Sequence, residues 1–234
     1  MTERIPEELV RLLETIESYA DEYVLIGGWV PQLCRMFGGI AWTGKLARTT
    51  EADVVVRASV PPGDRPLLRT LLERAGLRVR PGTTHRAIWE RVEDGTDALE
   101  LLTPRTGPIK GPETTNIGEQ PGVGAIVLSD LDLVMEFVTE LRVPSGQRSV
   151  RVRVPTLGAY IATKALTFSA RIARSDRTLE GQKRGKDLFY IYDVMMAGEE
   201  VRGRIKRDLA EIASGLVLGS AEDLVEMLRE TLPV

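Results

Sequence analysis

Residues 23–28 are Tyr23-Val24-Leu25-Ile26-Gly27-Gly28, a β-branched and aromatic run that stops at two glycines. The run predicts a short strand, and the two glycines predict a tight turn after it. Residues 29–36 then have helical character, and Pro31 would lie in the opening turn, where proline is tolerated. Backbone N–H groups of a glycine turn before a helix can approach a phosphate closely. We therefore expect a strand, a turn and a helix, with an anion site at Gly27 and Gly28.

Two further strands place carboxylates near this turn. Asp53–Val56 is a predicted buried strand, and side chains at positions i and i+2 point to one face, so Glu51 and Asp53 can converge. Glu100 lies within apolar residues 98–102, where an unpaired carboxylate would be costly to bury. Mg²⁺ prefers hard oxygen ligands and keeps waters or substrate phosphates in its shell. We expect these three carboxylates to be the catalytic residues and to bind Mg²⁺ beside the glycine turn.

Each of these features also has a plain structural interpretation. Glu51 would be a solvated loop residue, Asp53 a cap at the start of its strand, and Glu100 an outward residue on a two-faced sheet. The Gly27-Gly28 pair alone is equally compatible with an ordinary turn. The order of the glycine turn and the carboxylates along the chain favours the metal site.

The ordered set of motifs resembles the DNA polymerase beta nucleotidyltransferase superfamily. Val24–Trp29, Arg48–Val56 and Leu99–Pro104 are similar to its Gly-Gly, Asp-x-Asp and third-Asp motifs. The chain looks most similar to AbiEii-type nucleotidyltransferase toxins of bacterial toxin–antitoxin systems, in which an Arg and a Thr often precede the Asp-x-Asp, as Arg48 and Thr49 do here. The resemblance implies an α+β nucleotidyltransferase fold: a mixed β-sheet flanked by helices, plus a C-terminal helical lobe.

The resemblance extends to basic residues in the second half of the chain. Lys164 and Arg171 would share one face of a helix, and Lys186-Asp187 follows them, as in the family's Lys, Arg and Lys-Asp pattern. Asp187 is expected to orient Lys164 or an arginine, and a solvated helix face is the alternative. The resemblance implies that NTP phosphates are bound by Gly27, Gly28, Arg48, Thr49, Lys164, Arg171 and Lys186.

The sequence departs from the family at two carboxylates, because Glu51 and Glu100 stand where Asp is usual. Each change inserts one methylene, which moves the oxygens relative to a metal that demands near-octahedral geometry. Two consequences remain open: lower activity, or a preference for the larger Mn²⁺ over Mg²⁺.

The resemblance implies transfer of a nucleoside monophosphate from an NTP to an acceptor hydroxyl on RNA, such as tRNA, or on a protein, with an antitoxin protein as partner. The basic stretch 171–186 would follow an RNA backbone, or would simply be a solvated loop. Two alternatives remain: a catalytically weakened binding module with the same fold, and a small-molecule nucleotidyltransferase of the antibiotic-modifying kind.

The chain is expected to divide near residue 155, where mixed elements give way to helices alone. Residues 1–155 would form the nucleotidyltransferase catalytic lobe and residues 156–234 the helical lobe. Residues 103–124 are predicted to be an irregular stretch that could act as an active-site flap. Residues 131–154 are predicted to form a β-hairpin, with a helix as the alternative for its first half. Helices are predicted at 157–174, 186–196, 200–214 and 221–232.

The composition of the 234 residues is that of a soluble globular protein, with 43% hydrophobic and 28% charged residues. The 31 basic and 34 acidic side chains give a net charge of −3, which excludes a uniformly basic surface and limits any RNA site to a local patch. Cys34 is the only cysteine, so no intrachain disulfide can form, and no apolar run approaches the roughly 20 residues that span a bilayer. We expect a cytoplasmic protein that does not enter the membrane.

Overall fold

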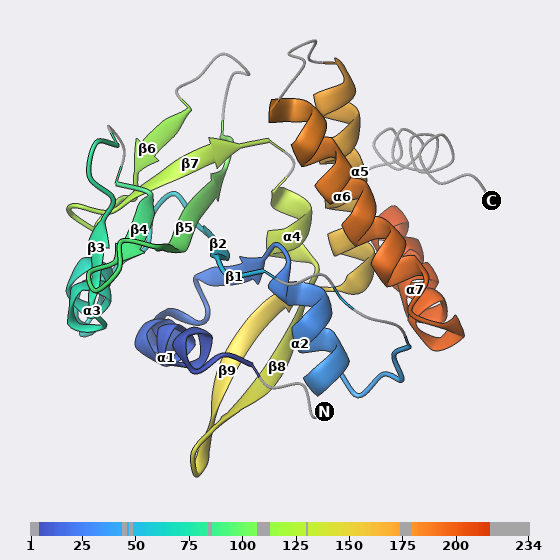
Figure 1. Cartoon of the computed structure of the whole chain (residues 1–234), viewed down its shortest axis with the longest axis horizontal. Helices are drawn as coiled ribbons and strands as arrows, with labels where there is room; N and C mark the ends of the chain where they lie inside the picture. The colour runs from blue at the N-terminus through green and yellow to red at the C-terminus, as the bar shows by residue number, and fades with distance from the viewer. Residues whose placement is uncertain are drawn as a thin grey trace.

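The computed structural model describes residues 5–43, 46, 49–83, 86–106, 113–129, 131–173 and 179–215, with the backbone alone for 170–173 and 179–184. Arg48 and the predicted helix 221–232 lie outside the described residues, as does the side chain of Arg171. The described residues form the expected α+β fold. Figure 1 shows α5, α6 and α7 on one side of the molecule and β3–β7 on the other.

A seven-stranded mixed sheet is the centre of the described structure, with strand order β1-β2-β5-β4-β3. β2 and β5 run parallel, whereas β1 and β4 run antiparallel to their neighbours. β7 pairs with the far end of β5, and β6 pairs with β7. The strands are β1 Tyr23–Ile26, β2 Ala52–Val56, β3 Leu77–Val79, β4 Ile88–Arg91, β5 Asp97–Pro104, β6 Thr114–Asn116 and β7 Gly124–Leu128.

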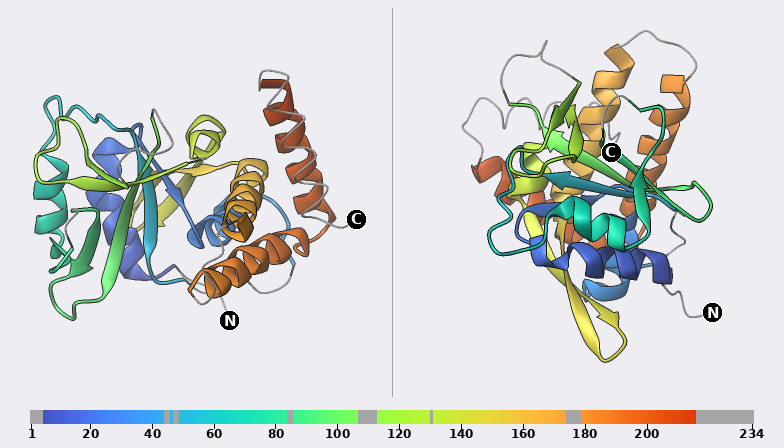
Figure 2. Two further views of the ribbon diagram at one scale, coloured as in Figure 1. Left: turned by 90° about the horizontal axis from the view of Figure 1, so that it is seen from above. Right: turned by 90° about the vertical axis from the view of Figure 1, so that its left-hand side faces the viewer.

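One face of the sheet packs on α1 (Glu7–Ile16) and α3 (Leu68–Arg74), which lie together in Figure 2. α1 forms because apolar residues recur at helical spacing, and Leu13 is fully buried against the sheet. A 3₁₀ turn, η1, follows at Glu17–Tyr19. Alternate residues of β2 and β5 complete this core, so the main hydrophobic cluster lies on the α1 side of the sheet.

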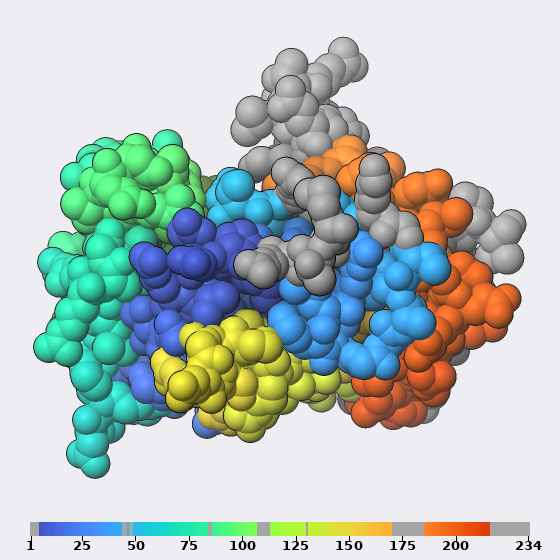
Figure 3. Space-filling model, turned by 60° about the horizontal axis from the view of Figure 1, so that its bottom comes forward, coloured from blue at the N-terminus to red at the C-terminus, as the bar shows by residue number. Residues whose placement is uncertain are grey.

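The helices of the second half follow a β-hairpin. α4 (Asp132–Glu136) precedes the hairpin strands β8 (Val138–Ser145) and β9 (Arg148–Pro155). Arg151 binds Asp21 through two hydrogen bonds of 2.8 Å, which ties the hairpin to the residues before β1. Figure 3 shows the hairpin surface adjoining those of α1 and α2. The remaining helices are α2 Trp29–Phe37, α5 Leu157–Ala173, α6 Leu179–Met195 and α7 Glu199–Gly215.

The strand, turn and helix predicted at residues 23–36 are confirmed, but other segments differ from the prediction. Residues 103–124 are not all irregular, because β6 forms within them and pairs with β7, a strand that the prediction omitted. β7 is aligned by its parallel pairing with β5, so tertiary contact decides its conformation more than local propensity. The first half of the predicted hairpin is divided between α4 and β8. α6 begins at Leu179 instead of Lys186, because the helix tolerates Gly181 and Gly185 inside it.

The predicted division near residue 155 remains a prediction. The change from sheet to helices does occur between Pro155 and Leu157. However, the largest hydrophobic cluster contains residues from both sides, such as Leu25 and Ile191. Among the described helices, none combines the length and the apolar character that crossing a bilayer requires.

Gln120 joins three separate parts of the fold. This side chain is 1% exposed and lies in the loop between β6 and β7. Its oxygen accepts a 2.8 Å hydrogen bond from the Leu68 backbone N–H at the start of α3. Its amide nitrogen donates to the Val60 carbonyl at 2.8 Å and to the Tyr19 hydroxyl at 3.1 Å.

We predict that Gln120→Leu lowers the free energy of unfolding by about 3 kcal/mol, because three polar groups each lose a buried hydrogen bond. Urea unfolding followed by circular dichroism measures the change. Gln147→Leu at the exposed hairpin tip is the matched control and should alter stability by no more than about 0.5 kcal/mol. Equal stability of the two variants would contradict the anchoring role of Gln120.

Candidate active site

The strand register brings two of the predicted carboxylates together. Asp53 of β2 and Glu100 of β5 are direct partners in the parallel ladder. Neighbouring residues in register point to the same face of a sheet, so the two carboxylates lie side by side. On its other side Asp53 pairs with Ile26, the last residue of β1 before the glycine turn. The register thus places both carboxylates next to that turn.

The carboxylates lie on the sheet face opposite α1 and α3. Val55 and Leu102, two residues further along the same strands, point to the same side as Asp53 and Glu100. They are buried in a second hydrophobic cluster with Val134 of α4. The candidate site is therefore on the α4 side of the sheet, bordered by an apolar cluster.

The two glycines of the turn are required for different reasons. Gly27 has a φ of +74°, which disfavours other residues, and the Asp53 carboxylate lies so close that a Cβ at Gly27 would collide with it. Gly28 has an ordinary helical φ of −68° and precedes α2 directly. There the constraint is space, because a Cβ would lie 2.5 Å from Oη of Tyr190 and 2.9 Å from Cβ of Thr49.

Basic residues reach the same place from α5 and α6. Lys164 Nζ lies 3.1 Å from Oδ1 of Asp187, so the predicted pairing of these two residues is confirmed. The ammonium groups of Lys164 and Lys186 lie 5.3 and 5.9 Å from the ring centre of Tyr190. Asp187 is buried, whereas Lys186 is exposed. The site thus has carboxylates on the sheet and ammonium groups on the helices.

The Asp53 carboxyl is electrostatically strained. Burial is the largest effect and raises the pKa of Asp53 to about 6. The charges of Lys164 and Lys186 lower this pKa, and the negative charge of Glu51 raises it. The two lysines therefore compensate only part of the cost of burying this carboxylate.

Two carboxylates suit Mg²⁺ here, but the predicted triad is not assembled in the described residues. Glu51 is exposed in a bend before β2, outside the strand. No group of three His, Cys, Asp or Glu side chains in the described part of the chain is close enough to bind one metal ion. Mg²⁺ is commonly bound by one or two carboxylates together with phosphate oxygens and waters, so Asp53 and Glu100 fit it as donors. Metal binding and the role of Glu51 remain predictions.

Tyr190 is the site residue that the sequence analysis missed. Its hydroxyl lies over Gly28, and its side chain is hydrogen-bonded to that of Thr49. Burial and, after it, the negative charge of Asp53 raise the pKa of Tyr190, while the bond to Thr49 lowers it. A signal was present in the sequence, because Tyr190 follows Lys186 by four residues and Asp187 by three, which places all three on neighbouring positions of one helix.

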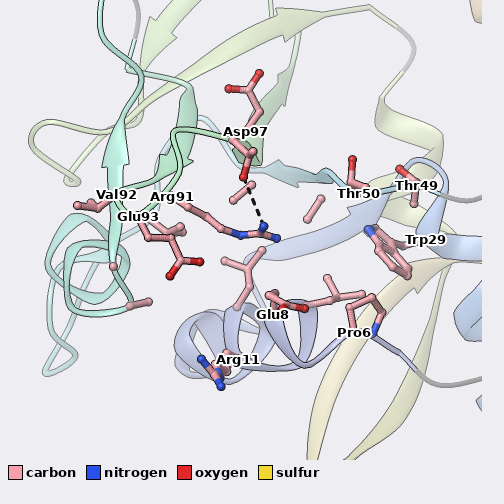
Figure 4. Close-up of a pocket in the computed structure, with 18 residues that line it drawn as sticks. Pro6, Glu8, Arg11, Trp29, Thr49, Thr50, Arg91, Val92, Glu93 and Asp97 are labelled. Atoms are coloured by element: carbon pink, nitrogen blue, oxygen red, sulfur yellow. Dashed lines mark hydrogen bonds between the residues drawn. The ribbon is translucent and has the colours of Figure 1, made fainter.

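A separate cavity of about 620 Å³ lies on the α1 side of the sheet. Figure 4 shows Trp29, Thr49 and Thr50 at one end of it and Arg91 and Glu93 at the other. Trp29 and Thr49 adjoin the glycine turn, but the residues lining this cavity include neither carboxylate of the β2–β5 pair and neither lysine. The chemistry is therefore assigned to the α4 side and not to this cavity.

An α+β fold with paired carboxylates, a glycine turn and facing lysines has the arrangement expected of an enzyme that acts on nucleotides. The sequence model of a family described as nucleotidyltransferase matches residues 6–213, and the chain belongs to this family. A crystal structure of an antigenic nucleotidyltransferase-like protein from Paracoccidioides brasiliensis is similar over 95% of this chain and 91% of that chain, at 16% identity and a TM-score of 0.40. A search of curated proteins gave no match. The membership rests on the family match, and the narrower AbiEii-type assignment remains a prediction.

Gly28→Ala should displace Tyr190 from Thr49, because the added methyl group overlaps the phenol oxygen. We expect a loss of about 1–3 kcal/mol in the free energy of unfolding, the usual cost of overpacking. Gly203→Ala in α7 is the control, since its Cβ would meet only the end of Arg207 at 3.8 Å, and it should stabilise by about 0.5–1 kcal/mol. Thermal unfolding measures the stability of both variants. A Gly28→Ala variant as stable as the wild type would refute the close approach of Tyr190 to Gly28.

Asp53→Asn should stabilise the metal-free protein at pH 7. A folded pKa of about 6 lies above the unfolded value of 3.8, so ionising Asp53 destabilises the fold as pH rises from about 4 to 6. Above about pH 6 the ionised carboxylate lowers the free energy of unfolding by about 3 kcal/mol, and the uncharged Asn side chain does not. The gain should vanish below about pH 4. Urea unfolding in EDTA at pH 4 and 7 tests this, with exposed Asp64→Asn as control; an equal effect at both pH values would contradict it.

Proposed function

We propose that this protein transfers a nucleoside monophosphate from an NTP to an acceptor hydroxyl and releases pyrophosphate. The observation that supports the proposal best is the pairing of Asp53 with Glu100 beside Gly27, opposite two lysines. Membership of the nucleotidyltransferase family implies an NTP as substrate. The reaction needs no covalent protein intermediate, because positioning and charge neutralisation suffice for phosphoryl chemistry.

The residues divide into an acidic and a basic side. Asp53 and Glu100 would hold Mg²⁺, or Mn²⁺ instead, and a bound divalent ion supplies Lewis-acid activation of the phosphate and of the attacking hydroxyl. Glu100 would lie on the side of the acceptor hydroxyl. Lys164 and Lys186 would neutralise the β- and γ-phosphates, and Asp187 fixes the direction of Lys164 through the 3.1 Å ion pair.

The glycine turn would receive the phosphate chain. α2 begins directly after Gly28, so the positive end of its dipole faces the turn. Pro31 has no N–H and the Val30 N–H donates to the Gly27 carbonyl at 3.3 Å, so Trp29 is the backbone donor within the first three helix residues. No side chain caps this helix start by a hydrogen bond. Thr49 adjoins Gly28 and would add a hydroxyl contact. We include Arg48 and Arg171 in the phosphate site from the sequence resemblance alone.

The acceptor and the biological role belong to the proposal as well. From the sequence resemblance we propose RNA, such as tRNA, or a protein as acceptor, a toxin role, and an antitoxin as binding partner in the cytoplasm. A catalytically weakened binding module is the second candidate, and the exposed position of Glu51 outside β2 favours it. The two differ in one property, which is metal-dependent turnover.

The test is incubation with each labelled NTP, total RNA and Mg²⁺ or Mn²⁺. We expect labelled RNA or protein product, and we expect Asp53→Ala and Glu100→Gln to lower its rate by about 100-fold or more, as removal of groups that stabilise a charged transition state does. Asp64→Asn, an exposed carboxylate elsewhere, should keep the wild-type rate.

Labelling that survives Asp53→Ala would contradict the assignment of this carboxylate. Nucleotide binding measured by calorimetry without any labelled product would favour the binding module instead.

A further inference from the structure

Tyr190 lies close to the glycine turn, to Thr49 and to both lysines of the candidate site. It projects from α6 and is 3% exposed, although the neighbouring Phe189 and Tyr192 are 51% and 60% exposed. Its hydroxyl is the atom nearest to the space above Gly28, at 2.5 Å from where a Cβ would lie. It is hydrogen-bonded to Thr49, on the segment that leads into β2. One side chain thus joins the helical half to the glycine turn.

The ring of Tyr190 also contacts the two cations. Lys164 of α5 and Lys186 of α6 approach it with their ammonium groups at 5.3 and 5.9 Å from the ring centre. Distances below about 6 Å are those of attractive cation–π contacts. Asp187 also forms an ion pair with Lys164, at 3.1 Å. The ring and this carboxylate together therefore restrict where the ammonium group of Lys164 can lie.

The phenol oxygen fills the space directly above Gly28, so a phosphate bound at the turn would lie next to it. The start of α2 presents the Trp29 N–H and a positive dipole end at Gly28, and Lys164 and Lys186 bring positive charge to the same place. A neutral hydroxyl among these positive groups can donate its hydrogen to an anion as well as pair with Thr49.

We propose that Tyr190 is a nucleotide-binding residue, whose hydroxyl donates a hydrogen bond to a triphosphate bound beside the glycine turn and whose ring orients Lys164 and Lys186 toward the same phosphates. The inference rests on the proposed function, because it assumes that an NTP occupies this site. It adds a phosphate ligand from α6 that the family resemblance did not indicate. It also assigns Gly28 a purpose, which is to leave room for the phenol.

Tyr190→Phe tests the hydroxyl while keeping the ring. Calorimetry with ATP, CTP, GTP and UTP in Mg²⁺, and with inorganic triphosphate in Mg²⁺, measures the dissociation constants. We expect the constant for the preferred NTP and that for inorganic triphosphate both to rise about tenfold or more, the usual effect of losing a hydrogen bond to a charged group. Tyr192→Phe, the same change on the exposed side of α6, should leave both constants unchanged.

A third variant separates the ring from the hydroxyl. Tyr190→Leu should weaken triphosphate binding more than Tyr190→Phe does, because the lysines lose the ring as well. Thermal unfolding accompanies each variant, so that binding is compared only between folded proteins.

The outcomes distinguish the inference from the function on which it rests. If the wild type binds NTP and Tyr190→Phe binds it equally well, the role of Tyr190 is refuted and the proposed function stands. If Tyr190→Phe weakens NTP but leaves inorganic triphosphate unaffected, the contact is not with the phosphates and the inference is overturned. If the wild type binds neither ligand, both the inference and the proposed function fail.

Discussion

The site depends on one constraint, which is the parallel register of β2 and β5. This register makes Asp53 and Glu100 neighbours, and the antiparallel register of β1 puts the end of that strand, and so the glycine turn, beside Asp53. A slip of one residue would turn a strand's side chains to the opposite face and separate the two carboxylates. Both faces of β2 are buried beyond Asp53, so hydrophobicity alone specifies the register weakly. The close fit of the Asp53 carboxylate against Gly27 adds the specificity that the valines lack.

The helical half completes what the sheet begins. α5 and α6 supply the lysines, and the segment between α2 and β2 is attached to the α6–α7 junction, where the Thr43 N–H donates to the Ala197 carbonyl at 2.8 Å. At the other end of the same segment Thr49 pairs with Tyr190. The chain that leads to Asp53 is therefore positioned by the helices and not by the sheet alone. Mutations in α6 can thus change the acidic side of the site without contacting a carboxylate.

Much of the fold followed from local sequence, and the departures have physical reasons. The YVLIGG stretch and the buried strands β2 and β5 are local signals, and the structure agrees with all of them. β6 and β7 are stabilised by pairing with β5, which no window of sequence shows. The helical spacing of Tyr190 from Lys186 and Asp187 was a local signal, but its contact with Thr49 joins residues that are distant in the chain. The pairing of Asp53 with Glu100 was predictable only as the convergence of motifs. For Glu51 the sequence left two interpretations open, a metal ligand or a solvated loop residue, and the structure has this side chain exposed before β2.

The electrostatics of the site favour joint binding of nucleotide and cation. Burial leaves the pKa of Asp53 raised to about 6 even with Lys164 and Lys186 nearby, so these two charges do not fully compensate one carboxylate. Lys164 is moreover shared with Asp187. A triphosphate would add several negative charges near Asp53 and would further raise the free-energy cost of ionising this carboxyl. Carboxylates and phosphates repel each other. A divalent ion bound between them would turn this repulsion into a net attraction, because it attracts both groups at once. In this proposal the lysines would neutralise the outer phosphates, and the carboxylates would act through the cation.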